Sequence, residues 1–232
     1  MSLPALLLRN AAFYLVFYTG SIVYTSAALL AGLFSQPAAQ EIVRGWALFH
    51  RWCVRHLIGC RFSIEGAPLG GPALYAVKHE SFFEAIDAPA LFLRPSVFAK
   101  QELFSIPLWG RAALDFGLIP VVREGGARTL MTMIRRAREM SEAGRPLVLL
   151  PEGTRVPHGS TPPLQAGFAG LYKALALPVV PVAINSGPAY HRWLKRPLPI
   201  TYRFGDPVPP GLPREEAEAR VHAAINALNT AP

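Results

Sequence analysis

Residues 73–87 read ALYAVKHESFFEAID, an apolar run that passes directly into a polar segment. A short apolar run bounded by polar residues is typical of a strand that is buried in a parallel sheet. Residues 147–155, LVLLPEGTR, repeat this arrangement. Because ligands bind beyond the carboxyl ends of such strands, both polar segments are candidates for the functional site of an α/β domain.

The body of the chain alternates between β-rich runs and helical patterns, which predicts an α/β fold with a mostly parallel central sheet flanked by helices. The expected strands cover residues 61–65, 73–77, 96–99, 118–122, 147–150, 179–184 and 201–204. Two helices are expected, over residues 127–141 and from about residue 214 to 228. The sequence contains no GxGxxG, P-loop, HExxH or GxSxG pattern, which argues against dinucleotide enzymes, P-loop NTPases, thermolysin-like zinc proteases and serine α/β-hydrolases.

The composition indicates a chain that works at a membrane or on acidic substrates. Of the 232 residues, 51% are hydrophobic and 16% are charged, against about 25% charged in an ordinary soluble domain. The net charge of +8 suits an anionic membrane surface or an acidic substrate, and with this apolar excess we expect no nucleic-acid partner. The two cysteines have no zinc-binding spacing, so we expect neither a metal site nor a disulfide scaffold.

The apolar excess is concentrated near the N-terminus. Residues 11–40 contain no charged side chain, and residues 11–34 would span about 36 Å as a helix, enough for a bilayer core of about 30 Å. We therefore expect a retained membrane segment. Two alternatives stay open: the TGS sequence at residues 19–21 could bend the segment into a re-entrant hairpin, or the segment could be a secretory signal peptide, although QPAA at residues 36–39 is a poor cleavage site.

A basic amphipathic helix is expected next, over residues 42–57. Such a helix either lies in a membrane interface or packs on the folded domain with its arginines in water. Its apolar stripe consists of Ile42, Trp46, Phe49, Cys53 and Leu57, and the opposite face carries Arg44, Arg51 and Arg55. We divide the chain into membrane-associated helices over residues 1–62 and an α/β domain over residues 63–232. Basic residues after the apolar run favour a cytoplasmic location for that flank.

His79 and Glu84 form a candidate general base. An imidazole accepts a proton, and a carboxylate beside it fixes its tautomer and stabilises its charged form. A spacing of five residues suits this pair only if His79 precedes a helix and Glu84 lies in its first turn. Ser81 favours that arrangement because Ser-x-x-Glu is a capping box, but the same pattern leaves open that Glu84 only caps Ser81. Asp87, almost one turn further on, is a second candidate for the orienting acid.

Basic residues near other strand ends are candidates for binding an anion. Gly153 allows the backbone to approach a ligand closely, and Arg155 offers a planar fork suited to phosphate. Lys100 and Arg123 each follow an expected strand and could face the same crevice. Each of these charges could equally be a solvated surface group, and spacing alone does not decide between the two.

In combination, these segments resemble the glycerolipid acyltransferases of the 1-acylglycerol-3-phosphate acyltransferase type. That family carries His-x4-Asp, a Gly/Pro-rich block that ends in Arg, a Phe-Pro-Glu-Gly-Thr-Arg-like block, and an apolar block with Pro. The matching stretches here are His79–Glu84, Lys100–Arg123, Leu150–Arg155 and Val179–Ile184, in the same order. Two positions depart from the pattern: Glu84 replaces the usual Asp, and Lys78 stands where the family often has Asn.

The resemblance implies an enzyme that moves a fatty acyl group from a thioester, acyl-CoA or acyl-acyl carrier protein, to the free hydroxyl of lysophosphatidic acid. It implies that His79, held by Glu84, takes the proton from that hydroxyl, and that no cofactor or metal takes part. The residues implied in holding the acceptor phosphate or shaping its pocket are Lys100, Arg123, Glu152, Gly153, Thr154 and Arg155. It also implies membrane lipids as partners and a location at the inner membrane, with the catalytic domain on the cytoplasmic side.

Three alternatives stay open at this point. The same chemistry could act on another lysolipid, such as lyso-ornithine lipid or a lysophospholipid. The chain could be a non-catalytic lipid-binding protein of the same fold, although a binder needs no base and the pair His79 and Glu84 is intact. It could also be a secreted hydrolase, which would require removal of residues 1–39.

Overall fold

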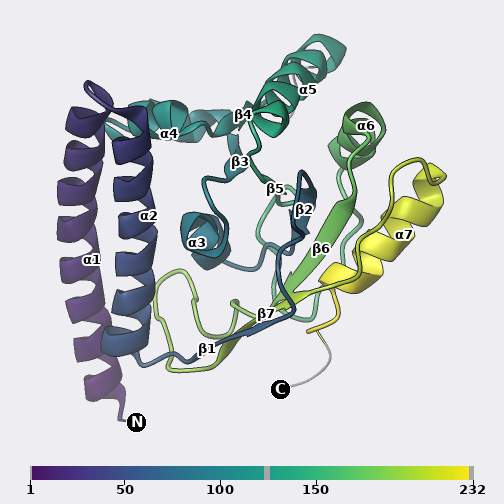
Figure 1. Cartoon of the computed structure of the whole chain (residues 1–232). Coiled ribbons are helices and arrows are strands. Elements are labelled where there is room, and N and C mark those ends of the chain that lie inside the picture. The colour runs from purple at the N-terminus through teal and green to yellow at the C-terminus, as the bar shows by residue number, and fades with distance from the viewer. Residues whose placement is uncertain (1, 123–125, 230–232) are drawn as a thin grey trace.

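Seven strands form one sheet in the computed structural model, which describes residues 2–122 and 126–229 (Figure 1). Their order across the sheet is β1-β7-β6-β2-β5-β3-β4, and all neighbours are parallel except β6 and β7. The strands are β1 (Phe62–Glu65), β2 (Leu74–Val77), β3 (Ser96–Lys100), β4 (Ile119–Val121), β5 (Leu147–Leu149), β6 (Val179–Ile184) and β7 (Ile200–Phe204). The mostly parallel sheet is thus confirmed, and each predicted strand is present with ends shifted by at most one residue.

Helices cover both faces of this sheet. The helices α1 (Leu3–Gly32), α2 (Gln36–Cys53) and α3 (Phe83–Leu91) lie on one face, and α5 (Gly126–Glu142), α6 (Ala166–Leu175) and α7 (Arg214–Ile225) lie on the other (Figure 1). In β2, Tyr75 and Val77 pack in the core on the α3 side, whereas Leu74 and Ala76 pack with residues of α5, α6 and α7. Both sides of the strand are therefore buried, which explains its continuous apolar sequence.

The two predicted helices in the body of the chain are present. The expected helix over residues 127–141 is α5, and the expected last helix is α7, which ends at Ile225 rather than near residue 228. A shorter helix, α4 (Trp109–Phe116), contacts the α1–α2 pair.

The first helix, α1, runs without interruption through Thr19, Gly20 and Ser21. The Ser21 hydroxyl donates to the carbonyl of Phe17 over 2.7 Å and accepts from the indole N–H of Trp46 in α2 over 2.9 Å. A Cβ atom at Gly20 would lie 2.3 Å from the Phe49 ring, so the glycine lets α2 approach closely. These small residues serve the packing of α1 against α2, and the bend that the sequence left open does not occur.

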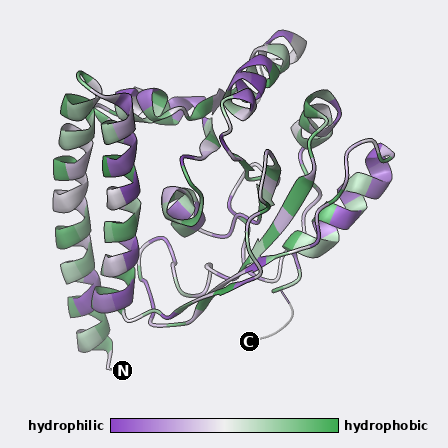
Figure 2. Ribbon diagram, viewed as in Figure 1, coloured by the Kyte–Doolittle hydropathy of each residue, from purple (hydrophilic) through white to green (hydrophobic). Residues whose placement is uncertain are grey.

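The outward face of α1 is apolar over most of its length (Figure 2). Leu8, Leu15 and Ile22 are 73%, 72% and 65% exposed. Among the described residues, α1 is the one helix that is long and apolar enough to cross a membrane. Length and composition therefore fit the expected membrane segment.

The second helix, α2, packs between α1 and α3. Arg51 of α2 donates from Nε and Nη2 to the carboxylate of Asp87 in α3, over 2.9 and 2.6 Å. Phe13 and Phe17 of α1 lie in the same buried cluster as the strand residue Val182. Packing on the folded domain, one of the two alternatives for this helix, is thus present, but Arg51 pairs with the buried Asp87 instead of lying in water. The division of the chain near residue 62 stays a prediction.

Candidate active site

His79 and Glu84 meet at the carboxyl end of β2. His79 lies two residues beyond the strand, Glu84 is in the first turn of α3, and the His79 Nδ1 atom lies 2.9 Å from Glu84 Oε1. The Glu84 side chain is fully buried, whereas 13% of the His79 side chain is exposed. With Nδ1 engaged by the carboxylate, Nε2 is the ring nitrogen that is left to exchange a proton with a ligand.

Glu84 also caps the start of α3. Its Oε1 accepts the backbone N–H of Ser81 over 2.8 Å, and its Oε2 accepts the hydroxyl of Ser186 over 2.7 Å. The Ser81 hydroxyl in turn accepts the backbone N–H of Phe83 over 3.0 Å. Capping and contact with His79, which the sequence presented as alternatives, therefore occur together on one carboxylate.

These hydrogen bonds decide the charge of Glu84. Burial alone would raise the pKa of its carboxyl, but the bonds from His79, Ser81 and Ser186 outweigh burial and hold the pKa below its ordinary value. The carboxylate is therefore ionised at neutral pH. An ionised carboxylate at this distance stabilises an imidazolium, which is what a general base becomes when it takes a proton.

Asp87, the rival acid, faces away toward α2. Both of its oxygens are held by Arg51, and the Tyr202 hydroxyl donates to Oδ2 over 3.1 Å. Burial raises the pKa of Asp87, and the Arg51 guanidinium offsets part of that rise. Asp87 thus joins α2 to α3, which leaves Glu84 as the acid beside His79.

Lys78 and Glu152 form a buried ion pair behind His79. The Lys78 ammonium donates to Glu152 Oε1 over 2.7 Å, to the carbonyl of Ser160 over 2.9 Å and to Asn226 Oδ1 over 2.7 Å. The second oxygen of Glu152 accepts the backbone N–H of His79 over 2.7 Å. Both side chains are at most 1% exposed. Glu152 therefore fixes the backbone of His79, and the lysine at the family's usual Asn position supplies its countercharge.

The loop after β5 lies against the His79 segment. The turn is closed by the Gly153 N–H, which donates to the Leu150 carbonyl over 2.9 Å, and Gly153 has a φ of 66°, which favours glycine. The Val156 N–H donates to the His79 carbonyl over 2.8 Å. Thr154 and Arg155 are exposed, and the Arg155 guanidinium lies 3.9 Å from the ring centre of Phe82. This arginine is therefore held beside the start of α3, close to the His79–Glu84 pair.

The other two predicted basic residues are less closely tied to this site. Lys100 is exposed at the end of β3, which β5 separates from β2 in the sheet. Arg123 lies outside the described residues. Their expected role in holding an anion stays a prediction.

Sequence patterns did not identify several described polar residues of the site, namely Ser186, Glu80, His158 and Asn226. Ser186 donates to Glu84. Glu80 Oε1 shares a hydrogen bond of 2.8 Å with His158 Nδ1, and Glu80 Oε2 accepts the Gly187 N–H over 2.8 Å. Ser186 follows the apolar strand β6, so the rule that singled out His79 would also have pointed to it. His158 and Glu80 are 78 positions apart, and nothing local in the sequence joins them.

Neither cysteine is suited to act as a nucleophile. Cys53 and Cys60 are both buried, and burial raises the pKa of each thiol to about 11. Since the thiolate is the reactive form, both are unreactive at neutral pH. Within the described part of the chain, no group of three or more His, Cys, Asp or Glu side chains is arranged to hold a metal ion.

The family model described as Acyltransferase matches residues 60–185, a range that contains His79, Glu84 and Arg155. The chain belongs to this acyltransferase family. Membership confirms the resemblance carried by the sequence motifs and identifies the protein as an acyl-transferring enzyme.

Two similar sequences and one similar crystal structure are also those of proteins named as acyltransferases. A 1-acyl-sn-glycerol-3-phosphate acyltransferase of Pseudomonas aeruginosa is 27% identical over 96% of this chain and 86% of its own length. One of Helicobacter pylori is 32% identical over 57% of this chain and 60% of its own length. The crystal structure of the 1-acyl-sn-glycerophosphate acyltransferase of Thermotoga maritima superposes with a TM-score of 0.76, covering 97% of this chain and 98% of that chain at 20% identity, which shows the shared fold.

Proposed function

We propose that this acyltransferase moves a fatty acyl group from an acyl thioester to the free hydroxyl of lysophosphatidic acid, giving phosphatidic acid. The observation that carries the proposal is the contact between His79 Nδ1 and the buried carboxylate of Glu84, beside an exposed arginine. The relatives in Pseudomonas and Helicobacter are both named for 1-acylglycerol-3-phosphate as the acceptor, which supports this choice of lysolipid.

In the proposed reaction, the base is needed because a hydroxyl is a poor nucleophile at neutral pH. His79 Nε2 takes the proton of the acceptor hydroxyl as its oxygen attacks the thioester carbonyl. Glu84 stabilises the imidazolium that results. The tetrahedral intermediate then collapses, the C–S bond breaks, and the leaving thiolate takes up the proton that His79 holds, which restores the neutral imidazole. The new ester bond replaces the thioester bond, so the reaction needs no reactant other than the acyl thioester and the lysolipid.

The acceptor phosphate would be held by the loop after β5. Arg155 supplies a guanidinium that can donate two parallel hydrogen bonds to phosphate oxygens. Its stacking on Phe82 limits its freedom, so less entropy is lost on binding. Gly153 and Thr154 line the same turn, Glu152 supports it from behind, and Lys100 and Arg123 would complete the positive surroundings.

We further propose that the enzyme is attached to the inner membrane through its N-terminal helices, with the catalytic domain on the cytoplasmic side. The apolar outward face of α1 supports attachment, and the basic residues that follow α1 support the orientation. Acyl-CoA or acyl-acyl carrier protein would supply the acyl group, and no cofactor is required.

An acceptor panel tests the proposed substrate. The purified chain in detergent would receive an acyl thioester and, in turn, lysophosphatidic acid, zwitterionic lysophospholipids and lyso-ornithine lipid, with diacyl products followed by mass spectrometry. We expect product from lysophosphatidic acid. Product from another lysolipid alone would contradict the proposed acceptor while keeping the reaction type.

The variant Arg155→Gln tests the proposed phosphate contact. We expect its KM for lysophosphatidic acid to rise about ten-fold or more, because a charge-assisted hydrogen bond is lost. The matched control is Arg136→Gln, on the exposed side of α5, where Arg136 pairs with Glu139 of its own helix. An unchanged KM in Arg155→Gln would remove the arginine from the acceptor site.

A further inference from the structure

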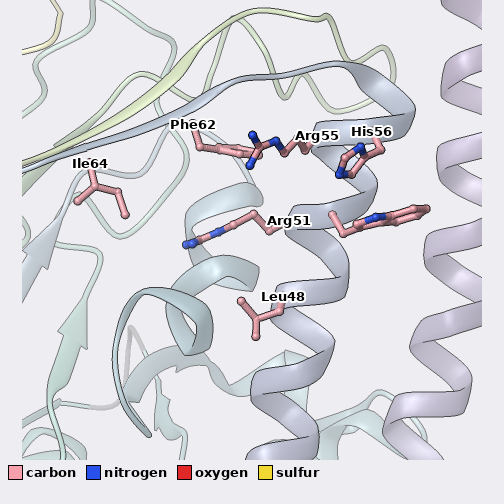
Figure 3. A pocket seen from close by; sticks show the side chains of 7 residues that line it. Leu48, Arg51, Arg55, His56, Phe62 and Ile64 are labelled. Carbon is pink, nitrogen blue, oxygen red and sulfur yellow. The ribbon is translucent and has the colours of Figure 1, made fainter.

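A basic groove lies between the end of α2 and β1, separate from the His79 site. Its volume is about 460 Å³. The groove is lined by Trp52 and by the residues labelled in Figure 3, which are Leu48, Arg51, Arg55, His56, Phe62 and Ile64. No lining residue is acidic. The proposed acyl transfer uses none of them, so the groove needs an explanation of its own.

Two guanidinium groups point into this groove from one side of α2 and of the π-helical segment Val54–Ile58 that continues it (Figure 3). Arg51 and Arg55 are four residues apart, a spacing that places side chains on the same helix face. Asp87 holds Nε and Nη2 of Arg51, which fixes the group and leaves Nη1 without that carboxylate. Arg55 is exposed and makes no hydrogen bond or ion pair with any residue that the structure describes. The groove therefore contains one neutralised, fixed arginine and one unneutralised arginine.

The walls of the groove are apolar and open to solvent. Leu48, Ile64 and Trp52 are 40%, 48% and 48% exposed. The Trp52 ring is packed against those of Phe49 and His56, with ring centres 6.4 and 5.2 Å apart. Exposed apolar side chains beside arginines suit a ligand with an anionic head and a hydrocarbon body, because a small inorganic ion would leave the walls in water.

The position of the groove identifies the source of such a ligand. One wall of the groove is formed by α2, which packs on its other side against α1, and the outward face of α1 is apolar (Figure 2). Tryptophan and arginine side chains next to an apolar helix are typical of the interface between lipid headgroups and water. We propose that the groove binds the phosphate headgroup of an anionic membrane phospholipid that is not a substrate, with Arg55 and Arg51 holding the phosphate. This proposal stands apart from the acyl transfer.

Fluorescence of Trp52 tests the proposal without any substrate of the reaction. The full chain, in micelles of a neutral detergent, would be titrated with brominated phosphatidylglycerol or brominated phosphatidylcholine, whose bromines quench nearby tryptophan. The signal of Trp52 is the difference between the chain and its Trp52→Phe variant. We expect half-quenching at an about five-fold lower mole fraction of the anionic lipid.

Two matched variants separate a built site from general charge. Arg55→Gln should bring the two lipids to equal quenching, whereas Arg44→Gln, which removes an exposed α2 arginine paired with Glu41, should keep the preference. Equal quenching of the unmodified chain by both lipids would overturn the proposal. An equal loss of the preference for the anionic lipid in Arg55→Gln and Arg44→Gln would also overturn it. Displacement of the lipid by millimolar inorganic phosphate would overturn the lipid as the ligand. All of these results are independent of whether His79 is the catalytic base.

Discussion

Replacing Lys78 with methionine removes the countercharge of a buried carboxylate. In the native structure, the Lys78 ammonium satisfies Glu152, Ser160 and Asn226, and its side chain and that of Glu152 are 0% and 1% exposed. In Lys78→Met, the His79 N–H is the one hydrogen-bond partner that Glu152 keeps among the residues that the structure describes. Breaking a buried pair by removing one partner costs about 3–5 kcal/mol. For a chain of 232 residues this corresponds to a fall in Tm of about 6–20 °C.

Thermal unfolding in detergent, followed by circular dichroism, measures this effect. The double variant Lys78→Met/Glu152→Gln should recover part of the lost stability, because the glutamine still accepts the His79 N–H and carries no charge. The control Lys173→Met, at an exposed lysine on α6, should change the free energy of unfolding by less than about 0.5 kcal/mol. If Lys78→Met unfolded within about 1 kcal/mol of the unmodified chain, the buried network would not stabilise the strand end as described.

Three further predictions follow from the site and from the helix pair. The pKa of the Glu84 carboxyl is lower in the folded chain than in the unfolded chain, so Glu84 stabilises the fold above its unfolded pKa, and this contribution is lost as the pH falls through the folded pKa. Ser186→Ala removes one of the hydrogen bonds that lower this pKa, so acid unfolding of the variant, followed by circular dichroism, should begin at a higher pH. An unchanged acid-unfolding profile would contradict the role of Ser186. His158→Ala frees the loop that carries Arg155 from Glu80, and steady-state kinetics should show a several-fold higher KM for the lysolipid with a smaller change in kcat; a loss confined to kcat would argue against this positioning role. Gly20→Ala should destabilise the chain by about 1–3 kcal/mol because the added Cβ atom would overlap the Phe49 ring. In the control Gly32→Ala, the added Cβ atom would lie 3.8 Å from its nearest neighbour, so this variant should be as stable as the unmodified chain or more stable. Equal Tm values for the two variants would refute the close packing of α1 on α2.

The strands were predictable because their signal is local. Every residue of β6 is buried, so its sequence is an uninterrupted apolar run, Val179–Ile184, which the polar residues Asn185 and Ser186 follow. The antiparallel placement of β7 and its position between β1 and β6 were not predictable in this way. Strand order depends on contacts between segments far apart in the chain, which a local pattern does not contain.

The helical N-terminus was predicted only in outline. The apolar run indicated a long helix, but the small residues at 19–21 looked like an interruption, whereas they accept the side chains of Trp46 and Phe49 from α2. A pattern within one helix cannot show that its small residues face a neighbouring helix. The partner helix has to be placed before these residues can be understood.

The functional site, too, was predictable from the sequence only in part. The contact of His79 with Glu84 spans five positions and could be predicted from helix geometry and the capping pattern. The interactions that hold this pair in place join Lys78 to Asn226, 148 positions away, and Glu84 to Ser186, 102 positions away. The pair was therefore visible in the sequence, while the buried network that fixes its geometry and charge required the fold.

The most direct test of the account is the rate of acyl transfer in the variants His79→Ala and Glu84→Gln. Both would be assayed in detergent with lysophosphatidic acid and an acyl thioester, after circular dichroism has shown that they are folded. We expect His79→Ala to lose about a thousand-fold or more in rate. We expect Glu84→Gln, which keeps the shape of the side chain but not its charge, to lose most of its activity as well. A folded His79→Ala variant that transfers acyl groups at nearly the unmodified rate would contradict the central claim that His79 is the base.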